Sequence, residues 1–212
     1  MLLKINHPFF TYEHLLDSPE NLTEIKNFLV TEENGLGLEY YLKETAAVEE
    51  QAQMNKTYLV KDKVTKEIVG YFSLRTGLFT LTTEEDDSFD SIPAIELSNF
   101  AINGLYRRNH PETIYLGRTL FSQFIVPIIM HIKSFVAVRA LYIYALPEDK
   151  LIQHYSSMGF HRLSPEEEAF VHNHVKPRYD KGCIFMYQIY LCGFNLFKIK
   201  FLFPNTKCLP MK

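Results

Sequence analysis

The stretch LIQHYSSMGF, residues 151–160, predicts where a helix ends and a strand begins. Gly159 suits the position just past a helix C-terminus, because the left-handed backbone conformation needed there carries no steric cost for glycine. Phe160 then begins a predicted strand. Tyr155 precedes the glycine by four residues. Either the ring of Tyr155 packs on a sheet, or its hydroxyl lies at a cleft, where it can donate a proton.

The segments around this stretch alternate between strand and helix patterns. ALYIYA (140–145) predicts a buried strand, residues 148–158 a helix, and FHRL (160–163) the start of a short strand. A charged helix near 165–173 and a last strand at 183–190 complete this half of the chain.

The N-terminal half contains two predicted helices and then a set of strands. Ser18-Pro19-Glu20 favours a helix start, and residues 38–53 have helical spacing. TYLVK (57–61) and EIVGYFSLRTGLFTL (67–81) are joined by a polar turn, which predicts an antiparallel pair.

Three further segments connect the two halves. We expect a solvated loop at the acidic run 84–87 and a strand at 94–102, directly after Pro93. Residues 117–135 predict an apolar helix that is kinked at Pro127, because proline lacks the N–H that a helix interior needs. Together these patterns predict an α+β fold with a mixed, mostly antiparallel sheet flanked by helices.

The length and composition fit one sizeable packed domain. The chain has 212 residues, of which 47% are hydrophobic. We expect a single domain over residues 1–190 and an apolar extension over 191–212. Residues 183–203 are apolar enough to raise the question of a membrane span, but four polar residues interrupt them: Gln188, Asn195, Lys198 and Lys200. We therefore expect a buried strand followed by a tail that packs on the domain or on the second subunit of a homodimer.

Charge and cysteine content indicate a cytoplasmic protein. The formal net charge of −3 gives no general attraction to nucleic acid or to anionic membranes. The three cysteines, Cys183, Cys192 and Cys208, are an odd number without metal-type spacing, which favours reduced thiols. The N-terminal residues lack the apolar core and cleavage site of a signal peptide.

Three stretches of the sequence resemble the GNAT acyl-CoA N-acyltransferases. IVGYFSLRTG (68–77) is similar to the central antiparallel strand of that family. AIELSNFAING (94–104), with LYRR (105–108) and LGRTLF (116–121), resembles its cofactor-binding strand, loop and helix. LYIYALPEDKLIQHYSSMGF (141–160) resembles its strand, helix and closing Tyr-to-Gly-Phe signature. The resemblance covers roughly residues 57–163 by motif, and it implies a GNAT-like fold.

The resemblance implies acetyl-CoA as co-substrate. Its pyrophosphate would bind backbone N–H groups at the start of a helix, which here gives Leu116, Gly117, Arg118 and Thr119, with Arg107 nearby. The pantetheine arm would pair with the main chain of Phe100, Ala101 and Ile102. Two features depart from the family pattern: NHPET (109–113) looks like an insertion, and Tyr115 takes the place of the middle glycine.

The resemblance also assigns Tyr155 the role of general acid to the departing CoA thiolate. A thiol has a pKa near ~8.5 and a phenol near ~10, so a phenol can supply this proton in a dry site. Strand alternation puts Glu96, Ser98 and Phe100 on one face, and Glu96 would accept the amine's proton through water. His110 is a second candidate base. His172 and His174 lack a third ligand, so we expect no metal site.

Three functions remain open at this stage. We expect an acyl-CoA N-acyltransferase that acetylates a primary amine by direct attack. GYFSL (70–74) has some similarity to toxin-type members that acetylate aminoacyl-tRNA, although the acidic balance speaks against a tRNA substrate. A non-catalytic GNAT-fold binding module is the third alternative, and the insertion at 109–113 favours it.

Overall fold

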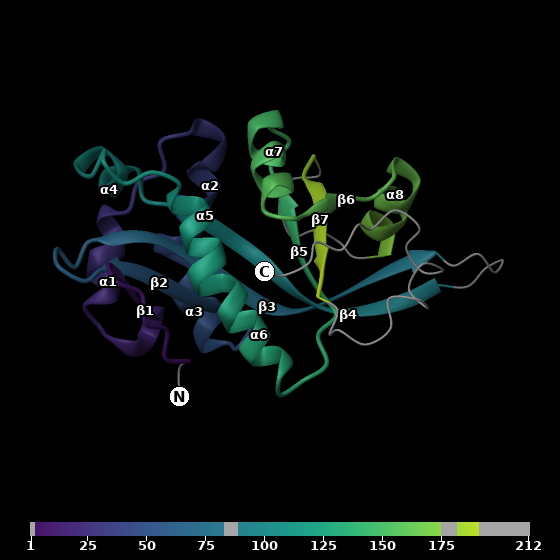
Figure 1. Ribbon diagram of the computed structural model, residues 1–212, viewed down its shortest axis with the longest axis horizontal. Coiled ribbons are helices and arrows are strands. Elements are labelled where there is room, and N and C mark those ends of the chain that lie inside the picture. The colour runs from purple at the N-terminus through teal and green to yellow at the C-terminus, as the bar shows by residue number, and fades with distance from the viewer. Residues whose placement is uncertain (1–2, 83–88, 175–181, 191–212) are drawn as a thin grey trace.

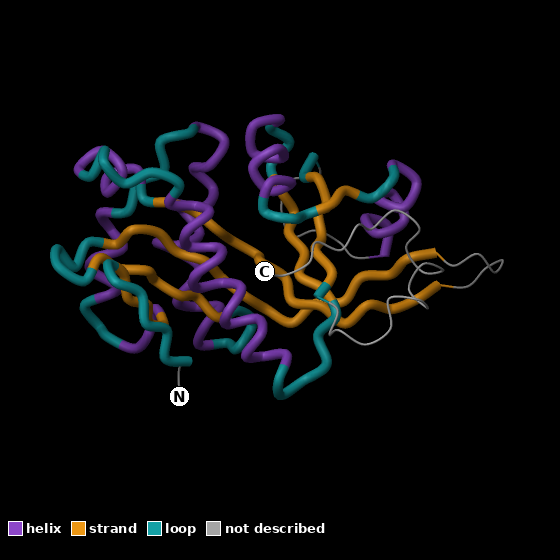
Figure 2. The backbone as a smooth tube through the Cα atoms, viewed as in Figure 1, coloured by secondary structure: helices purple, strands orange, loops and turns teal. Residues whose placement is uncertain are grey.

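A computed structural model describes residues 3–82, 89–174 and 182–190 (Figure 1, Figure 2). Its strands form one seven-stranded sheet in the order β1-β2-β3-β4-β5-β7-β6. Neighbouring strands run antiparallel, except for the parallel pair β4–β5. The strands are β1 (Phe10–His14), β2 (Lys56–Asp62), β3 (Ile68–Thr82), β4 (Phe89–Ile102), β5 (Ala140–Ala145), β6 (His161–Arg162) and β7 (Ile184–Ile189). This mixed, mostly antiparallel sheet confirms the predicted fold class.

Helices pack on both sides of the sheet. They are α1 (Asn21–Glu24), α2 (Leu36–Tyr40), α3 (Ala46–Gln51), α4 (Gly104–Asn109), α5 (Leu116–Leu120), α6 (Val126–Lys133), α7 (Asp149–Ser157) and α8 (Pro165–His174). Two π-helical segments, Tyr41–Thr45 and Phe121–Ile125, join α2 to α3 and α5 to α6. Short 3-10 turns lie at Leu15–Asp17, Ile25–Asn27 and Glu33–Gly35.

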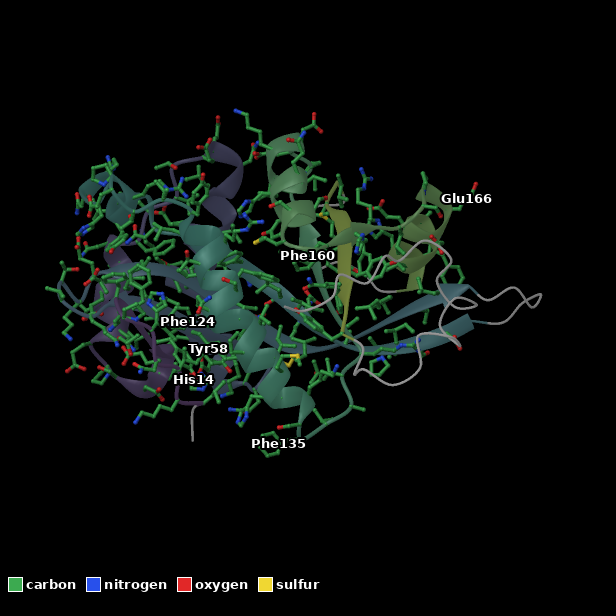
Figure 3. All side chains as sticks on the ribbon, in the orientation of Figure 1. His14, Tyr58, Phe124, Phe135, Phe160 and Glu166 are labelled. Carbon is green, nitrogen blue, oxygen red and sulfur yellow. The ribbon has the colours of Figure 1, made fainter. Side chains whose placement is uncertain are left out.

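The continuous helix α5–α6 crosses one face of the sheet, as Figure 1 shows. Leu120 and Phe124 of this helix join one core cluster with Phe72 and Leu74 of β3. Helix α7 also packs on this side, since Phe160, just after α7, lies 5.5 Å from Phe121 between ring centroids. In Figure 3, the labelled Phe124 lies by the α5–α6 helix and Phe160 lies near α7. We call this side of the sheet the α5 face.

The opposite side, which we call the α8 face, holds two smaller core clusters. Tyr71 of β3 packs there with residues of α2 and α3, and Phe79 packs with Val171 of α8. These β3 residues alternate with Phe72 and Leu74, which point to the α5 face. The division follows from the alternation of side chains along a strand.

A β-bulge in β4 changes which side chains share a face. Ser73 of β3 pairs with Asn99 and Leu74 pairs with Leu97, so Ser98 is an extra residue without a partner on β3. The alternation therefore shifts by one residue at this point. Glu96 lies on the α8 face, whereas Phe100 packs on the α5 face. The prediction that Glu96, Ser98 and Phe100 share one face was wrong for this reason.

Most predicted elements are confirmed, with several changes at their ends. The helix expected from Ser18 begins only at Asn21 and is short, and β4 begins before Pro93. The helix with Pro127 is continuous, because π-type geometry just before the proline adjusts the hydrogen-bond pattern. Strand β1 and helix α4 were not predicted.

Several sequence predictions fall on residues that the structure does not describe. The acidic run 84–87 and the extension 191–212, with Cys192 and Cys208, lie outside the described residues. Cys183 is buried. No helix in the described part of the chain is both long and apolar enough to cross a membrane.

Candidate active site

Strands β4 and β5 separate after a short common stretch. Ala94, Ile95 and Glu96 pair with Ala140, Leu141 and Tyr142, and the ladder ends there. Strand β4 continues to Ile102 while it remains paired with β3 on its other side. Within the described residues, the main chain of Phe100–Ile102 therefore has no strand beside it on the β5 side. Such an open strand edge can accept hydrogen bonds from, and donate them to, an extended ligand.

Helix α5 starts close to this opening. Its first residues Leu116, Gly117 and Arg118 belong to the first turn, where backbone N–H groups have no partner within the helix. Thr119, by contrast, donates its backbone N–H to the carbonyl of Tyr115 at 2.9 Å. The first turn thus offers N–H groups of three of the four predicted residues to an anion.

The atypical loop keeps the backbone shape that a glycine would give. Tyr115 is the N-cap residue of α5 and has φ 57° and ψ 28°, in the left-handed region. Its side chain is 73% exposed, so the ring occupies solvent rather than the start of the helix. The extra residues of the loop are accommodated after α4, whose N-terminus is capped by the Asn103 side chain.

The side chains of His154 and Arg118 lie at the start of α5. A Cβ added to Gly117 would lie 3.0 Å from Nε2 of His154, so the imidazole rests on the first turn. Arg118 donates from Nη2 to the carbonyl of Ser157 at 3.0 Å. The pKa of His154 is lowered, first by burial and then by the charges of Arg118 and Arg107. His154 was not predicted as a site residue from the sequence. The one feature that could have indicated it is that it directly precedes Tyr155.

Tyr155 lies in the last turn of α7, on the α5 face. The N–H of Phe160 bonds the carbonyl of Tyr155 at 3.1 Å and the N–H of Gly159 bonds that of Ser156 at 3.0 Å, which together form a Schellman motif. Gly159 has φ +95°, as predicted. The side chain of Tyr155 is buried, and its ring meets Phe160 edge-on at 5.5 Å. Burial raises the pKa of Tyr155, so the phenol stays protonated at neutral pH.

Glu96 lies at the point where β4 and β5 separate, on the α8 face. Its Oε1 is 2.6 Å from Nη2 of Arg75, and its Oε2 accepts a hydrogen bond from the hydroxyl of Tyr142 at 2.8 Å. A Cβ at Gly77 would lie only 2.5 Å from the Tyr142 ring, so a glycine is needed beneath this ring. Glu96 and Tyr155 thus lie on opposite faces of the sheet.

The structure does not bring His110 to this site. Its Nε2 is 2.7 Å from Glu67, and its ring stacks on Tyr106 with centroids 4.2 Å apart. Glu67 lies just before β3, eight residues before Arg75. At ~3.3 Å per residue, this places His110 roughly 25 Å from the Arg75–Glu96 pair. His110 therefore forms a structural ion pair.

Among the residues that the structure describes, which include His172, no three side chains are grouped so that they could hold a metal ion.

A central parallel pair that opens into a gap, with a helix starting beside it, is the arrangement of the GNAT acyltransferases, and the chain has this fold. Solved structures of toxins share it. A mutant of the toxin KacT with phenylalanine in place of a tyrosine is 17% identical, with a TM-score of 0.59 over 85% of this chain and 95% of that one.

Two AtaT complexes are similar to the same extent. One is a mutant of AtaT that also has phenylalanine in place of a tyrosine. It is bound to the C-terminus of the antitoxin AtaR and to acetyl-CoA, and it is 18% identical with a TM-score of 0.58. That match covers 85% of this chain and 92% of the toxin. AtaT complexed with acetyl-methionyl-tRNAfMet is 18% identical with a TM-score of 0.58, over 83% and 93% of the two chains. No protein-family model and no curated protein sequence matches this chain.

Proposed function

We propose that this protein transfers an acetyl group from acetyl-CoA to a primary amine. The observation that carries the proposal is the end of the β4–β5 ladder at Glu96 and Tyr142. In this proposal the pantetheine arm pairs with the main chain of Phe100–Ile102, and the thioester enters the opening. The pyrophosphate binds the N–H groups of Leu116–Arg118, where Arg107, Arg118 and His154 meet it. The N–H of Thr119 is already bonded to the carbonyl of Tyr115, so in this proposal Thr119 lies near the pyrophosphate without donating its N–H to it.

The reaction is a direct attack by the amine on the thioester carbonyl. The amine nitrogen forms a bond to the carbonyl carbon, and the carbon–sulfur bond then breaks. The sulfur leaves as a thiolate and takes the proton of the Tyr155 hydroxyl, which solvent later replaces. A buried phenol that stays protonated at neutral pH is suited to this donation.

Glu96 has its role on the acceptor side of the opening. Each of its oxygens already has one partner, but a carboxylate has about four lone-pair sites and can bind an amine as well. We propose that Glu96 orients the amine and receives its proton through water. The division between the two faces keeps the amine and the CoA sulfur on separate routes to the same carbonyl carbon.

An aminoacyl-tRNA is the second candidate acceptor. The similar solved structures are toxins, one of them with an acetylated methionyl-tRNA, and the α-amine of an aminoacyl-tRNA is a primary amine. Arg107, Arg108 and Arg118 are exposed and basic. The net charge of −3 speaks against strong tRNA binding, because tRNA affinity depends on phosphate neutralisation.

The test is acetyl transfer from radiolabelled acetyl-CoA to a panel of acceptors: aminoacyl-tRNA, a peptide with a free N-terminus and a lysine, and small primary amines. We expect label in at least one acceptor, and a steep loss of rate with salt only if the acceptor is tRNA. Calorimetry with acetyl-CoA accompanies the assay. If no acceptor is labelled and acetyl-CoA does not bind at millimolar concentration, the non-catalytic binding module is the correct reading.

A further inference from the structure

Two polar atoms on the α8 face have no partner in the part of the chain that the structure describes. The hydroxyl of Tyr144, on β5, and Nε2 of His172, on α8, are both buried and make no hydrogen bond. Their rings lie 5.7 Å apart between centroids. Buried polar atoms are hydrogen-bonded in nearly all folded proteins, so two unsatisfied atoms on neighbouring rings require a reason. One such reason is a ligand group that binds both.

These two atoms border the acceptor side of the opening. Tyr144 follows Tyr142 by two residues, so both side chains point to the α8 face, where Tyr142 binds Glu96. The pKa of Tyr144 is raised first by burial and then by the charge of Glu96, while Arg75 lowers it. Burial is the main cause of the raised pKa, so the Tyr144 hydroxyl stays protonated and can donate.

The surroundings define what kind of group fits. The Tyr144 ring lies against two other rings, Tyr142 at 5.9 Å and Phe185 at 5.5 Å. The rings around Tyr144 are thus aromatic, with a phenol and an imidazole nitrogen as hydrogen-bonding groups. A carbonyl oxygen accepts such bonds without bringing a charge into the site. Tyr144 and His172 are only partly buried as whole residues, so solvent reaches the edge between β5 and α8.

Tyr142 connects the two proposed contacts. Its hydroxyl binds Glu96 at 2.8 Å, and its ring lies 5.9 Å from the Tyr144 ring between centroids. An amine bound by Glu96 and a carbonyl oxygen bound by Tyr144 would therefore be near neighbours in the acceptor.

We propose that Tyr144 and His172 bind the carbonyl group of an acceptor whose free amine is on the adjacent carbon, that is, an amino-acid ester or amide. The inference rests on the proposed function and narrows its acceptor to this class. Both aminoacyl-tRNA and the N-terminus of a peptide belong to the class, whereas a lysine side chain does not. Helix α8, which is held on the sheet by Val171 and by the bond from the Phe185 N–H to Glu168 at 2.8 Å, forms one wall of the site.

The experiment compares acceptors with and without the carbonyl. Wild-type protein and Tyr144→Phe are assayed with aminoacyl-tRNA, phenylalanine amide and 2-phenylethylamine, which lacks the carbonyl. We expect Tyr144→Phe to lower kcat/KM about 5- to 10-fold for the carbonyl acceptors, through KM, and to leave 2-phenylethylamine unaffected. An unchanged kcat/KM for every carbonyl acceptor overturns the inference, as does wild-type turnover confined to amines without the carbonyl. A wild type that acetylates nothing contradicts the proposed function instead.

His172 is tested by a pair of substitutions. Gln places a side-chain nitrogen or oxygen near the position of Nε2, whereas Asn reaches only as far as Nδ1. We expect His172→Gln to retain the preference for carbonyl acceptors and His172→Asn to lose it, and equal behaviour of the two contradicts the role of Nε2. Tyr187→Phe is the matched control, because Tyr187 belongs to the same aromatic cluster but Glu167, not Glu96, is the charge that acts on it. Its acceptor preference should equal that of the wild type.

Discussion

Glu96 and Tyr155 lie on opposite faces of the sheet, on either side of the place where strands β4 and β5 separate. Glu96 is the last β4 residue that pairs with β5, and Tyr155 shares its core cluster with Ile143 and Ala145, which lie on β5 past that pair. A thioester held in the opening would present its sulfur to the phenol and its carbonyl to an amine from the other side. In the proposed reaction, the two groups would therefore act from separate layers of the fold.

Tyr155→Phe should lower kcat by about 10²–10⁴-fold, the usual contribution of a positioned general acid. The ring and its contact with Phe160 remain, so we expect the free energy of unfolding to stay near that of the wild type. Acetyl-CoA affinity should also remain, because the hydroxyl acts on the departing thiolate. Steady-state kinetics, calorimetry with acetyl-CoA and denaturant unfolding measure the three quantities. A kcat within threefold of the wild type would remove Tyr155 from the mechanism.

The sequence predicts β5 and α7 nearly to the residue, because a run of apolar residues and a glycine stop are local signals. Strand β1 escapes prediction since FTYEH is half polar and follows His7-Pro8, and α4 escapes because its residues resemble a loop. The bulge at Ser98 has no local signal at all. It depends on how β3 and β4 pair, and it decides that Glu96 and Phe100 lie on different faces.

The ion pair between Arg75 and Glu96 should stabilise the fold in a coupled way. Removal of one partner leaves the other charge in a poorly solvated place, since the two side chains are only 17% and 3% exposed. We expect Arg75→Met to cost about 3–5 kcal/mol of unfolding free energy, and Glu96→Gln to cost less because Arg75 is the more exposed partner. The double variant should lose clearly less than the sum of the two. Denaturant unfolding of all four proteins gives the coupling, and strict additivity would show that the pair is not linked.

Gly117→Ala should weaken acetyl-CoA binding without unfolding the protein. The added methyl group lies 3.0 Å from Nε2 of His154, at the place where the phosphates would approach. Helix propensity favours alanine over glycine by up to ~1 kcal/mol, which offsets the cost of a small shift of His154. We expect at least a tenfold rise in the Kd for acetyl-CoA, roughly the value of a charge-assisted hydrogen bond.

The control for this substitution is Gly37→Ala in α2. A Cβ at Gly37 would meet no atom within 4 Å, so the substitution should stabilise the helix and leave acetyl-CoA binding unchanged. Equal Kd values for Gly117→Ala and the wild type would place the phosphates elsewhere.

Acetyl-CoA binding should be accompanied by proton uptake near pH 6.5. Burial and the charges of Arg118 and Arg107 lower the pKa of His154, so the free protein holds this imidazole neutral. Phosphate groups beside the two arginines would offset their charge and raise that pKa. Calorimetry in two buffers of different ionisation enthalpy measures the uptake, which should vanish in His154→Asn. Uptake that persists unchanged in this variant would assign the proton to another group.

The ion pair of His110 and Glu67 should make stability depend on pH. The hydrogen bond to Glu67 raises the pKa of His110 above its usual 6.5, and the same bond lowers the pKa of Glu67 below its usual 4.5. The stabilisation from the histidine is therefore complete below pH 6.5 and is lost as the pH rises through the raised pKa. The contribution of Glu67 is present above pH 4.5 and is lost as the pH falls through its lowered pKa. An exposed pair of this kind contributes about 0.2–1 kcal/mol. His110→Gln should therefore be less stable than the wild type at pH 6 and nearly equal to it at pH 9, as judged by denaturant unfolding. A difference that is the same at both pH values would mean that packing on Tyr106, rather than charge, is what His110 contributes.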